Sequence, residues 1–271
     1  MTYFFDIVFS WATFFTSFFD NFLVTLIVTV LIGAFIFWCT PAIVSKSKMD
    51  VIEASDINPT LKSALTSTKL WIYKGTCGRY TRATTIPKLA ESARNASLGR
   101  DIKIYLMNPK NDELCSEYSI YRRSLKSSDK KNPWTKEIVQ EEIIATVVVA
   151  LKYRYSEPLL RIDVFFLEYF SAFRLDISDN FVVVTKEDKA ASALKADAET
   201  YFYDSYKDDI RLTERQSKNL KHFNELIFDE TINEKKLKQI LDTTRLFEFS
   251  KLSPKSIENI LEKINNPQDP Y

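Results

Sequence analysis

The chain has 271 residues, of which 45% are hydrophobic and 27% charged, with 37 lysines and arginines against 36 aspartates and glutamates. A net charge of +1 argues against a general nucleic-acid binder, so we expect no direct DNA binding. A single histidine, His222, excludes multi-histidine zinc sites. The three cysteines, Cys39, Cys77 and Cys115, match no CxxC pattern. We therefore expect no metal, no cofactor and a reducing compartment.

An uncharged apolar stretch lies near the N-terminus. Residues 22–40 read FLVTLIVTVLIGAFIFWCT, and 19 residues of helix cross the ~30 Å hydrocarbon core of a bilayer. Because Pro41 follows, we predict a transmembrane helix over 22–41 within a membrane anchor of residues 1–42. The alternative is a buried core helix, but such helices are usually shorter and rarely lack a polar face.

The residues before this stretch are aromatic but more polar. Residues 3–19 contain seven phenylalanines and one tryptophan together with Asp6 and several hydroxyl side chains. They are expected to lie in the membrane interface or to extend the spanning helix, and a two-span hairpin is the less favoured alternative. Without the basic start and the cleavage site of a signal peptide, the segment is expected to be a retained anchor.

Flanking charges predict the orientation of the anchor. Only Asp6 and Asp20 precede the apolar stretch, whereas Lys46 and Lys48 follow it directly. Since the positive side of a membrane helix stays cytoplasmic, a single-pass protein with a cytoplasmic C-terminal domain is predicted.

The cytoplasmic part is expected to begin with a βαβ unit. Residues 43–67 read as a linker carrying a short helix, and residues 69–73 as a strand that ends at a glycine-containing loop. A helix from Ile86 to Leu98, capped by Gly99, leads to a second strand over 101–107. Strand, loop, helix and strand imply a parallel, Rossmann-like sheet with a right-handed crossover.

The second half of the chain is expected to be more mixed. Apolar spacing and turn signals predict helices over 112–125 and 135–155, strands over 159–166, 169–177 and 181–185, and charged helix over 189–228. For the apolar run 143–151, a helix is favoured over a buried strand.

The turn at residues 178–180 predicts a hairpin, and residues 229–271 a small helical hairpin rather than a DNA-binding helix-turn-helix. The fold class is thus α/β, with an α+β tendency in the second half and an α/β domain over residues 68–228.

The loop KGTCGRYTR, residues 74–82, is the best candidate site. Its glycines let backbone N–H groups approach an anion, and its cations precede a helix N-terminus whose dipole favours negative charge. The alternative is an ordinary strand-to-helix turn with exposed arginines. The predicted ligand-binding residues are Lys74, Gly75, Thr76, Gly78, Arg79, Tyr80, Arg82 and Arg122.

Arg122 belongs to a second basic aromatic cluster with Tyr118, Tyr121 and Arg123. In a parallel sheet the loop and the Asn108-Pro109 turn both follow the carboxyl ends of strands, so the two clusters are expected to face one crevice. The alternative is pairing of these arginines with the acidic residues of the same helix, Asp112, Glu113 and Glu117.

No residue is predicted to be catalytic. Cys77 lies one residue too near Arg82 for a cysteine-phosphatase cradle, and His222 is expected to be a surface histidine. The competing hypothesis is a membrane-bound nucleotide hydrolase or transferase that uses the same loop. Its candidate bases are Asp101, Asp163 and Glu168.

The order LWIYKGTCGRYTR, IPKLAESAR and RDIKIYLMNP over residues 70–109 resembles the first half of phospholipase D-like and related Rossmann-type domains of bacterial defence proteins. The HxKxxxxD signature is missing, so the resemblance implies no phosphodiesterase activity. The strand-loop unit is also similar to deoxyribosyltransferase-like nucleotide folds. An N-terminal anchor before such a domain is similar to membrane effectors of antiphage systems, including those of retrons and of cyclic-nucleotide signalling.

That resemblance implies an inner-membrane effector or sensor that acts in antiviral defence. The implied partners are the lipid bilayer, a nucleotide or phosphate ligand, a regulatory protein or ribonucleoprotein, and further copies of the chain in the active state.

Overall fold

The computed structural model describes residues 2–188, 190–221 and 226–270 and divides the chain into two units, residues 1–48 and 49–271. His222, predicted to lie on the surface, falls outside the described residues. In the first unit, helix α1 (Thr2–Lys46) runs without a break through both aromatic and apolar stretches and through Pro41. Residues 3–19 therefore belong to the same helix as the apolar stretch, and the helix does not end at Pro41.

One segment of α1 is long and apolar enough to cross a membrane. This segment, Thr13–Cys39, has 27 residues, or roughly 40 Å of helix at 1.5 Å per residue. Membrane anchors and signal sequences share this length and composition. No other helix of the described residues has these properties.

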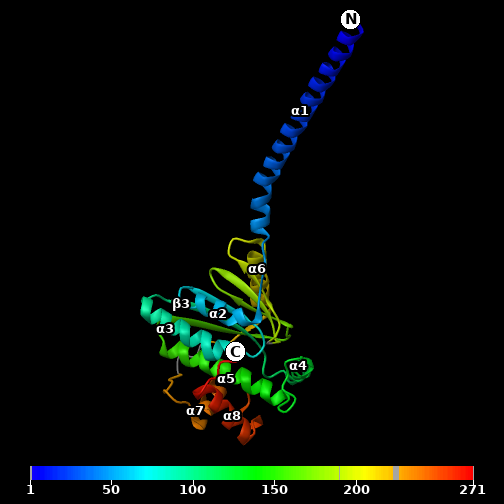
Figure 1. Cartoon of the computed structure of the whole chain (residues 1–271). Coiled ribbons are helices and arrows are strands. Elements are labelled where there is room, and N and C mark those ends of the chain that lie inside the picture. The colour runs from blue at the N-terminus through cyan, green and yellow to red at the C-terminus, as the bar shows by residue number, and fades with distance from the viewer. Residues whose placement is uncertain (1, 189, 222–225, 271) are drawn as a thin grey trace. The chain divides into compact units, whose positions relative to one another are not determined.

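The second unit is built on an eight-stranded mixed sheet with the strand order β1-β7-β6-β5-β2-β3-β4-β8 (Figure 1). Strands β2, β3 and β4 are parallel, and β5 pairs antiparallel with β2. The strands are β1 (Asp50–Ile52), β2 (Leu70–Lys74), β3 (Arg100–Met107), β4 (Leu160–Leu167), β5 (Phe173–Ile177), β6 (Phe181–Lys186), β7 (Ala193–Asp197) and β8 (Lys218–Asn219). The expected α/β fold, the parallel β2-β3 pair and the β5-β6 hairpin are confirmed.

Helices cover both faces of the sheet. Side chains alternate along each strand, so that Trp71 and Tyr73 join the larger core while Ile72 joins the smaller one. The smaller core packs under α6 (Tyr201–Gln216). The larger core packs under α2 (Ala54–Ala64), α3 (Ile86–Ala96), α4 (Asp112–Ser124), α5 (Lys136–Ser156), α7 (Glu234–Thr244) and α8 (Pro254–Asn265).

Helix α5 is the centre of the larger core. It packs against β4 on one side and α8 on another, and Figure 1 shows it beside α3 along the sheet. Every residue from Val139 to Leu151 is buried. The predicted helix is confirmed, and its burial on all sides explains why the run carries no amphipathic period. Thr135 caps it by accepting a hydrogen bond from the N–H of Ile138.

Three expectations were wrong. Helix α3 is capped by Ser97, which takes the left-handed conformation at φ 51°, rather than by Gly99. The short helix expected within residues 43–67 is present as α2, but the expectation of a linker is wrong, because Ile57, Leu61 and Ala64 bury an apolar stripe of that helix in the core and β1 pairs with β7. The charged region 189–228 contains β7 and β8 as well as α6, because Ala193 and Ala196 on β7 turn inward and add a strand to the β5-β6 hairpin.

Candidate functional site

Two strand ends meet at the site. Strand β6 pairs antiparallel with β5, and β5 pairs antiparallel with β2, so β6 and β2 run in the same direction and end at the same edge of the sheet. The loop after β2 and the residues after β6, Glu187 and Asp188, therefore lie beside one another. This edge also holds the carboxyl ends of β3 and β4, where open α/β sheets bind ligands.

The β2–α3 loop turns sharply at Gly78. Its φ of +68° is a conformation that residues with a Cβ rarely adopt, and an added Cβ would meet Thr146 Cγ2 at 2.8 Å. The Gly78 N–H donates to the hydroxyl of Tyr73 at 3.2 Å. Helix begins directly at Arg79, passes through a π-helical turn, Thr81–Thr85, and continues as α3. The first N–H groups of this helix thus face the end of the sheet.

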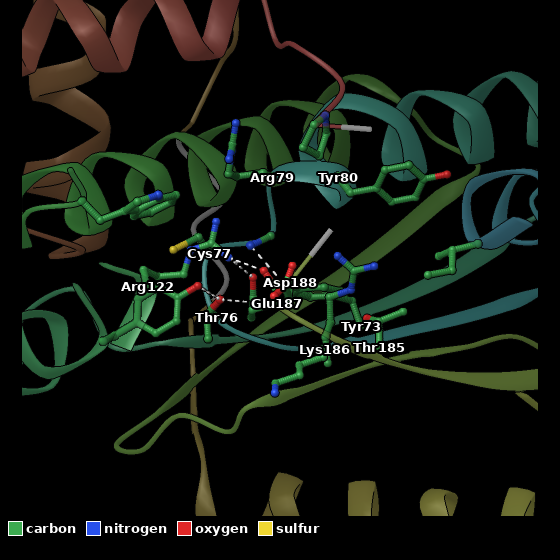
Figure 2. A pocket seen from close by; sticks show the side chains of 16 residues that line it. Tyr73, Thr76, Cys77, Arg79, Tyr80, Arg122, Thr185, Lys186, Glu187 and Asp188 are labelled. Carbon is green, nitrogen blue, oxygen red and sulfur yellow. Dashed lines mark hydrogen bonds and ion pairs between the residues drawn. The ribbon is translucent and has the colours of Figure 1, made fainter. Parts of the chain in front are cut away.

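A cavity of about 60 Å³ opens at this place (Figure 2). Since one water needs roughly 10–15 Å³, the space takes about four to six atoms of that size, which is room enough for a phosphoryl group. Its walls come from α2, β2 and the loop after it, α4, Trp134 two residues before α5, the start of β5, the end of β6 with the two residues after it, and the C-terminal segment. The residues are Ile57, Tyr73, Thr76, Cys77, Gly78, Arg79, Tyr80, Tyr118, Arg122, Trp134, Arg174, Thr185, Lys186, Glu187, Asp188 and Pro270.

Two arginines from different elements meet at Trp134. The guanidinium carbon of Arg122 on α4 lies 4.7 Å from the centre of the Trp134 ring, and that of Arg79 lies 5.8 Å from it. At these distances, cation–π interactions with the ring hold planar guanidinium groups in defined positions. One arginine of each predicted cluster, Arg79 and Arg122, therefore lines the same pocket.

The acidic partner of Arg122 is Glu187, not the acidic residues of α4. Arg122 Nη1 donates to the Glu187 carboxylate at 3.0 Å and to its backbone oxygen at 2.6 Å. Thr76 Oγ1 lies 2.8 Å from Glu187 Oε1 and 2.8 Å from the Tyr118 hydroxyl. Because a carboxylate only accepts, Thr76 donates to Glu187 and accepts from Tyr118. Figure 2 shows Thr76, Glu187 and Arg122 together in the pocket.

Several polar atoms of the pocket have no hydrogen-bond partner among the described residues. The Thr185 hydroxyl is one, on a residue that is only 2% exposed, and the Nε atoms of Arg79 and Arg122 are two more. The nearest carboxylate to Arg79, that of Glu142, lies 3.8 Å away. Since buried polar groups normally have partners, the pocket is rich in unused donors, as an anion site requires.

Three predicted ligand residues do not reach the pocket. Lys74 extends to the other face of the sheet, where it contacts Asp209 and Thr213 on α6. Gly75 lies against the Tyr73 ring, where a Cβ would meet the hydroxyl at 2.3 Å. Arg82 points inward and pairs with Glu142 on α5 at 2.7 Å. The other five, Thr76, Gly78, Arg79, Tyr80 and Arg122, line the pocket.

Burial suppresses the acidity of the groups at the floor of the pocket. It raises the pKa of the Cys77 thiol well above its usual value, and the nearby carboxylates of Glu142 and Glu187 raise it further. The pKa values of Tyr73 and Tyr118 are raised for the same reasons, burial first and Glu187 next. A thiol kept protonated is a poor nucleophile, which favours a packing role for the buried Cys77 in the wall of the pocket.

The three carboxylates of the enzyme hypothesis lie elsewhere. Asp163 contacts Arg154 and Arg161, Glu168 accepts hydrogen bonds from Asn108 and Asn111, and Asp101 is exposed on β3. None of them lines the pocket. Within the described residues, no group of three histidine, cysteine or acidic side chains is placed to hold a metal ion.

Glu187, Trp134, Thr185 and Arg174 are pocket residues that sequence analysis missed. Glu187 and Trp134 belong to no sequence motif identified above. Thr185 was placed at the end of a strand, but no sequence signal shows that β5 and β6 lie next to β2. The only available signal was the tryptophan directly before a helix cap, Trp134-Thr135.

Comparisons with known proteins give only distant likenesses. No protein-family model and no curated protein sequence matches the chain. Among solved structures, the archaeal chromatin protein TrmBL2, described as showing a novel mode of DNA binding, has a TM-score of 0.36 at 10% identity, over 76% of this chain and 68% of that one. A phosphatidylserine synthase of Haemophilus influenzae has a TM-score of 0.43 at 14% identity, over 73% of this chain and 46% of that one. The chain thus spans less than half the length of the synthase.

One expectation about partners is withdrawn. The absence of direct DNA binding was inferred from the net charge of the whole chain, which says nothing about any one face, and a DNA-binding chromatin protein is among the distantly similar structures, so the expectation is not kept. At these identities and TM-scores, neither likeness assigns a ligand or a partner to this chain.

Proposed function

We propose that the chain is a membrane-anchored sensor or effector whose globular unit binds a phosphate-bearing ligand in the pocket beside Trp134. The observation that carries the proposal is the convergence of Arg79 and Arg122 on the Trp134 ring at a cavity of phosphoryl size. Arginine guanidinium groups bind phosphate oxygens in pairs of hydrogen bonds. The buried Thr185 hydroxyl adds a further donor without a partner among the described residues.

The anchor part of the proposal concerns α1. The segment Thr13–Cys39 crosses the membrane once, and Lys46 and Lys48 keep the globular unit on the cytoplasmic side of the inner membrane. In the antiphage setting that the sequence resemblance implies, a phosphate-bearing signal would bind the pocket and the anchor would then damage the membrane.

Titration of the full chain in detergent micelles with inorganic phosphate tests the pocket. Arg79→Gln and Arg122→Gln are each expected to weaken binding about ten- to a hundredfold, since each removes a charge-assisted hydrogen bond. Arg123→Gln is the matched control, because Arg123 neighbours Arg122 on α4 but is exposed and does not line the pocket. Equal phosphate binding by the wild type and the three variants would show that this pocket is not the phosphate-binding site.

The anchor is tested in bacteria. Expression of the full chain is expected to collapse the membrane potential on activation, whereas a version without residues 1–42 is expected to leave it intact. Equal toxicity of the two versions would contradict the effector part of the proposal.

A further inference from the structure

The pocket contains a negative charge of its own. The carboxylate of Glu187 receives hydrogen bonds from the Arg122 guanidinium and from the Thr76 hydroxyl. A guanidinium and a hydroxyl are also the donors that a phosphate oxygen takes. The Glu187 carboxylate therefore occupies the position in which these donors would bind an anion. It also neutralises Arg122, whose guanidinium lies over the Trp134 ring.

Glu187 can leave this position at little cost to the sheet. The pairing of β6 with β5 ends at Lys186, one residue earlier, and β7 begins only at Ala193. No strand pairing of the described residues depends on Glu187. A rotation of this side chain breaks the contacts of its carboxylate with Arg122 and Thr76. It leaves the hydrogen bond from Arg122 to the Glu187 backbone oxygen and the hairpin unchanged.

We infer that Glu187 competes for the anion position of the pocket and that the ligand which replaces it is a phosphomonoester dianion. This inference rests on the proposed function. A phosphomonoester carries about −1.5 to −2 charges and three strong acceptor oxygens, so it gains more from Arg79, Arg122 and Thr185 than a carboxylate of charge −1 does. A phosphodiester has a charge of only −1 and gains no electrostatic advantage over Glu187. The cavity of about 60 Å³ has room for one phosphoryl group, and the carboxylate adds to that space as it leaves.

Isothermal titration of the full chain with inorganic phosphate and with dimethyl phosphate tests the inference. Glu187→Gln keeps the shape of the side chain and removes its charge. If the binding-competent state of the wild type is populated to about 10%, the substitution lowers the Kd for phosphate about tenfold. Glu117→Gln is the matched control, since it makes the same exchange on α4, next to Tyr118, at an exposed residue that does not line the pocket. It is expected to change the Kd less than twofold.

The outcomes separate the inference from the proposed function. Tighter phosphate binding by Glu187→Gln alone, with no binding of dimethyl phosphate by the wild type, supports the inference. Unchanged or weaker phosphate binding by Glu187→Gln, while Arg79→Gln still loses affinity, overturns it and leaves the proposed function standing. Absence of phosphate binding in the wild type and in Glu187→Gln overturns both. Thermal unfolding of each variant shows whether it is folded, and Glu187→Ala provides a second uncharged variant should the glutamine fail to fold.

Discussion

Arg82 and Glu142 form a buried ion pair with 2.7 Å between Nη2 and Oε2, and their side chains are 3% and 8% exposed. The pair joins the first helical turns after β2 to the central helix α5. It explains why Arg82, three residues after Arg79, does not face the pocket: its Nη1 also donates to the Glu142 backbone oxygen and lies 3.2 Å from Thr146 Oγ1. Arg82 thus orients the loop that carries the pocket-lining residues Thr76, Gly78 and Arg79.

Removing one partner of this pair is expected to be costly. Arg82→Met leaves Glu142 buried with only the longer contacts to Arg79 and Lys263, and loss of a buried partner lowers the free energy of unfolding by about 3 kcal/mol or more. Replacing both residues, Arg82→Met with Glu142→Leu, is expected to recover most of the loss. Denaturant unfolding of the full chain in micelles measures both values. A single variant as stable as Arg123→Gln would show that the pair is unimportant.

The same pair predicts a loss of stability in acid. Burial raises the pKa of Glu142, but Arg82, Lys263 and Arg79 together outweigh it, so the pKa lies below its ordinary value of 4.5. A lowered pKa in the folded state adds stability that is present above pH 4.5 and is lost as the pH falls through the folded value. In Glu142→Gln the free energy of unfolding is expected to fall less between pH 5 and pH 3 than in the wild type. Equal slopes for the two proteins would contradict this assignment.

Local patterns were enough to predict most of the helices and strands. The βαβ unit, the β5-β6 hairpin and α5 were found because apolar spacing and turn residues mark them within a few residues of sequence. The antiparallel pairing of β5 with β2 depends on contacts about a hundred residues apart, such as Ile72 with Ile177. No periodicity carries that information, so the position of Glu187 beside Thr76 could not be predicted.

The candidate site, too, could be predicted only in part from local sequence patterns. The glycines and cations of residues 74–82 predicted a site in this loop, and Thr76, Gly78, Arg79 and Tyr80 do line the pocket. Which of its cations face the pocket was not predictable, because this depends on partners from other elements. Asp209 on α6 holds Lys74 on the opposite face of the sheet, and Glu142 on α5 holds Arg82 in the core.

Gly78 and Gly99 are expected to respond differently to alanine. At Gly78 a Cβ is strained by φ +68° and lies 2.8 Å from Thr146 Cγ2, so Gly78→Ala is expected to lower the free energy of unfolding by about 2 kcal/mol. At Gly99 the nearest atom is 3.8 Å away and φ is not positive. Gly99→Ala is therefore expected to be neutral, or stabilising by about 0.4–1 kcal/mol. Equal losses at both sites, measured by denaturant unfolding, would contradict this account of the loop.

The two buried cysteines of the globular unit are expected to be unreactive in the native state. Burial raises the pKa of Cys77 well above its usual value and raises that of Cys115 to about 12, so neither forms appreciable thiolate at pH 8. In a Cys39→Ser background, iodoacetamide at pH 8 is expected to label the protein only after unfolding, when two groups are added per chain. A cysteine placed at the exposed position Ser127 provides the control for rapid labelling. Fast native labelling of Cys77 would restore it as a candidate nucleophile.

A charge in the middle of α1 is expected to prevent membrane integration. Leu26 lies at the centre of the segment Thr13–Cys39, where an arginine costs about 2.5–3.5 kcal/mol in insertion. Leu26→Arg is expected to shift the chain from the carbonate-resistant membrane fraction to the carbonate-extractable fraction. Ser47→Arg adds the same charge just beyond the end of α1, where the positive-inside rule favours it, and is expected to leave the chain in the membrane. Full membrane retention of Leu26→Arg would indicate that this segment does not cross the bilayer.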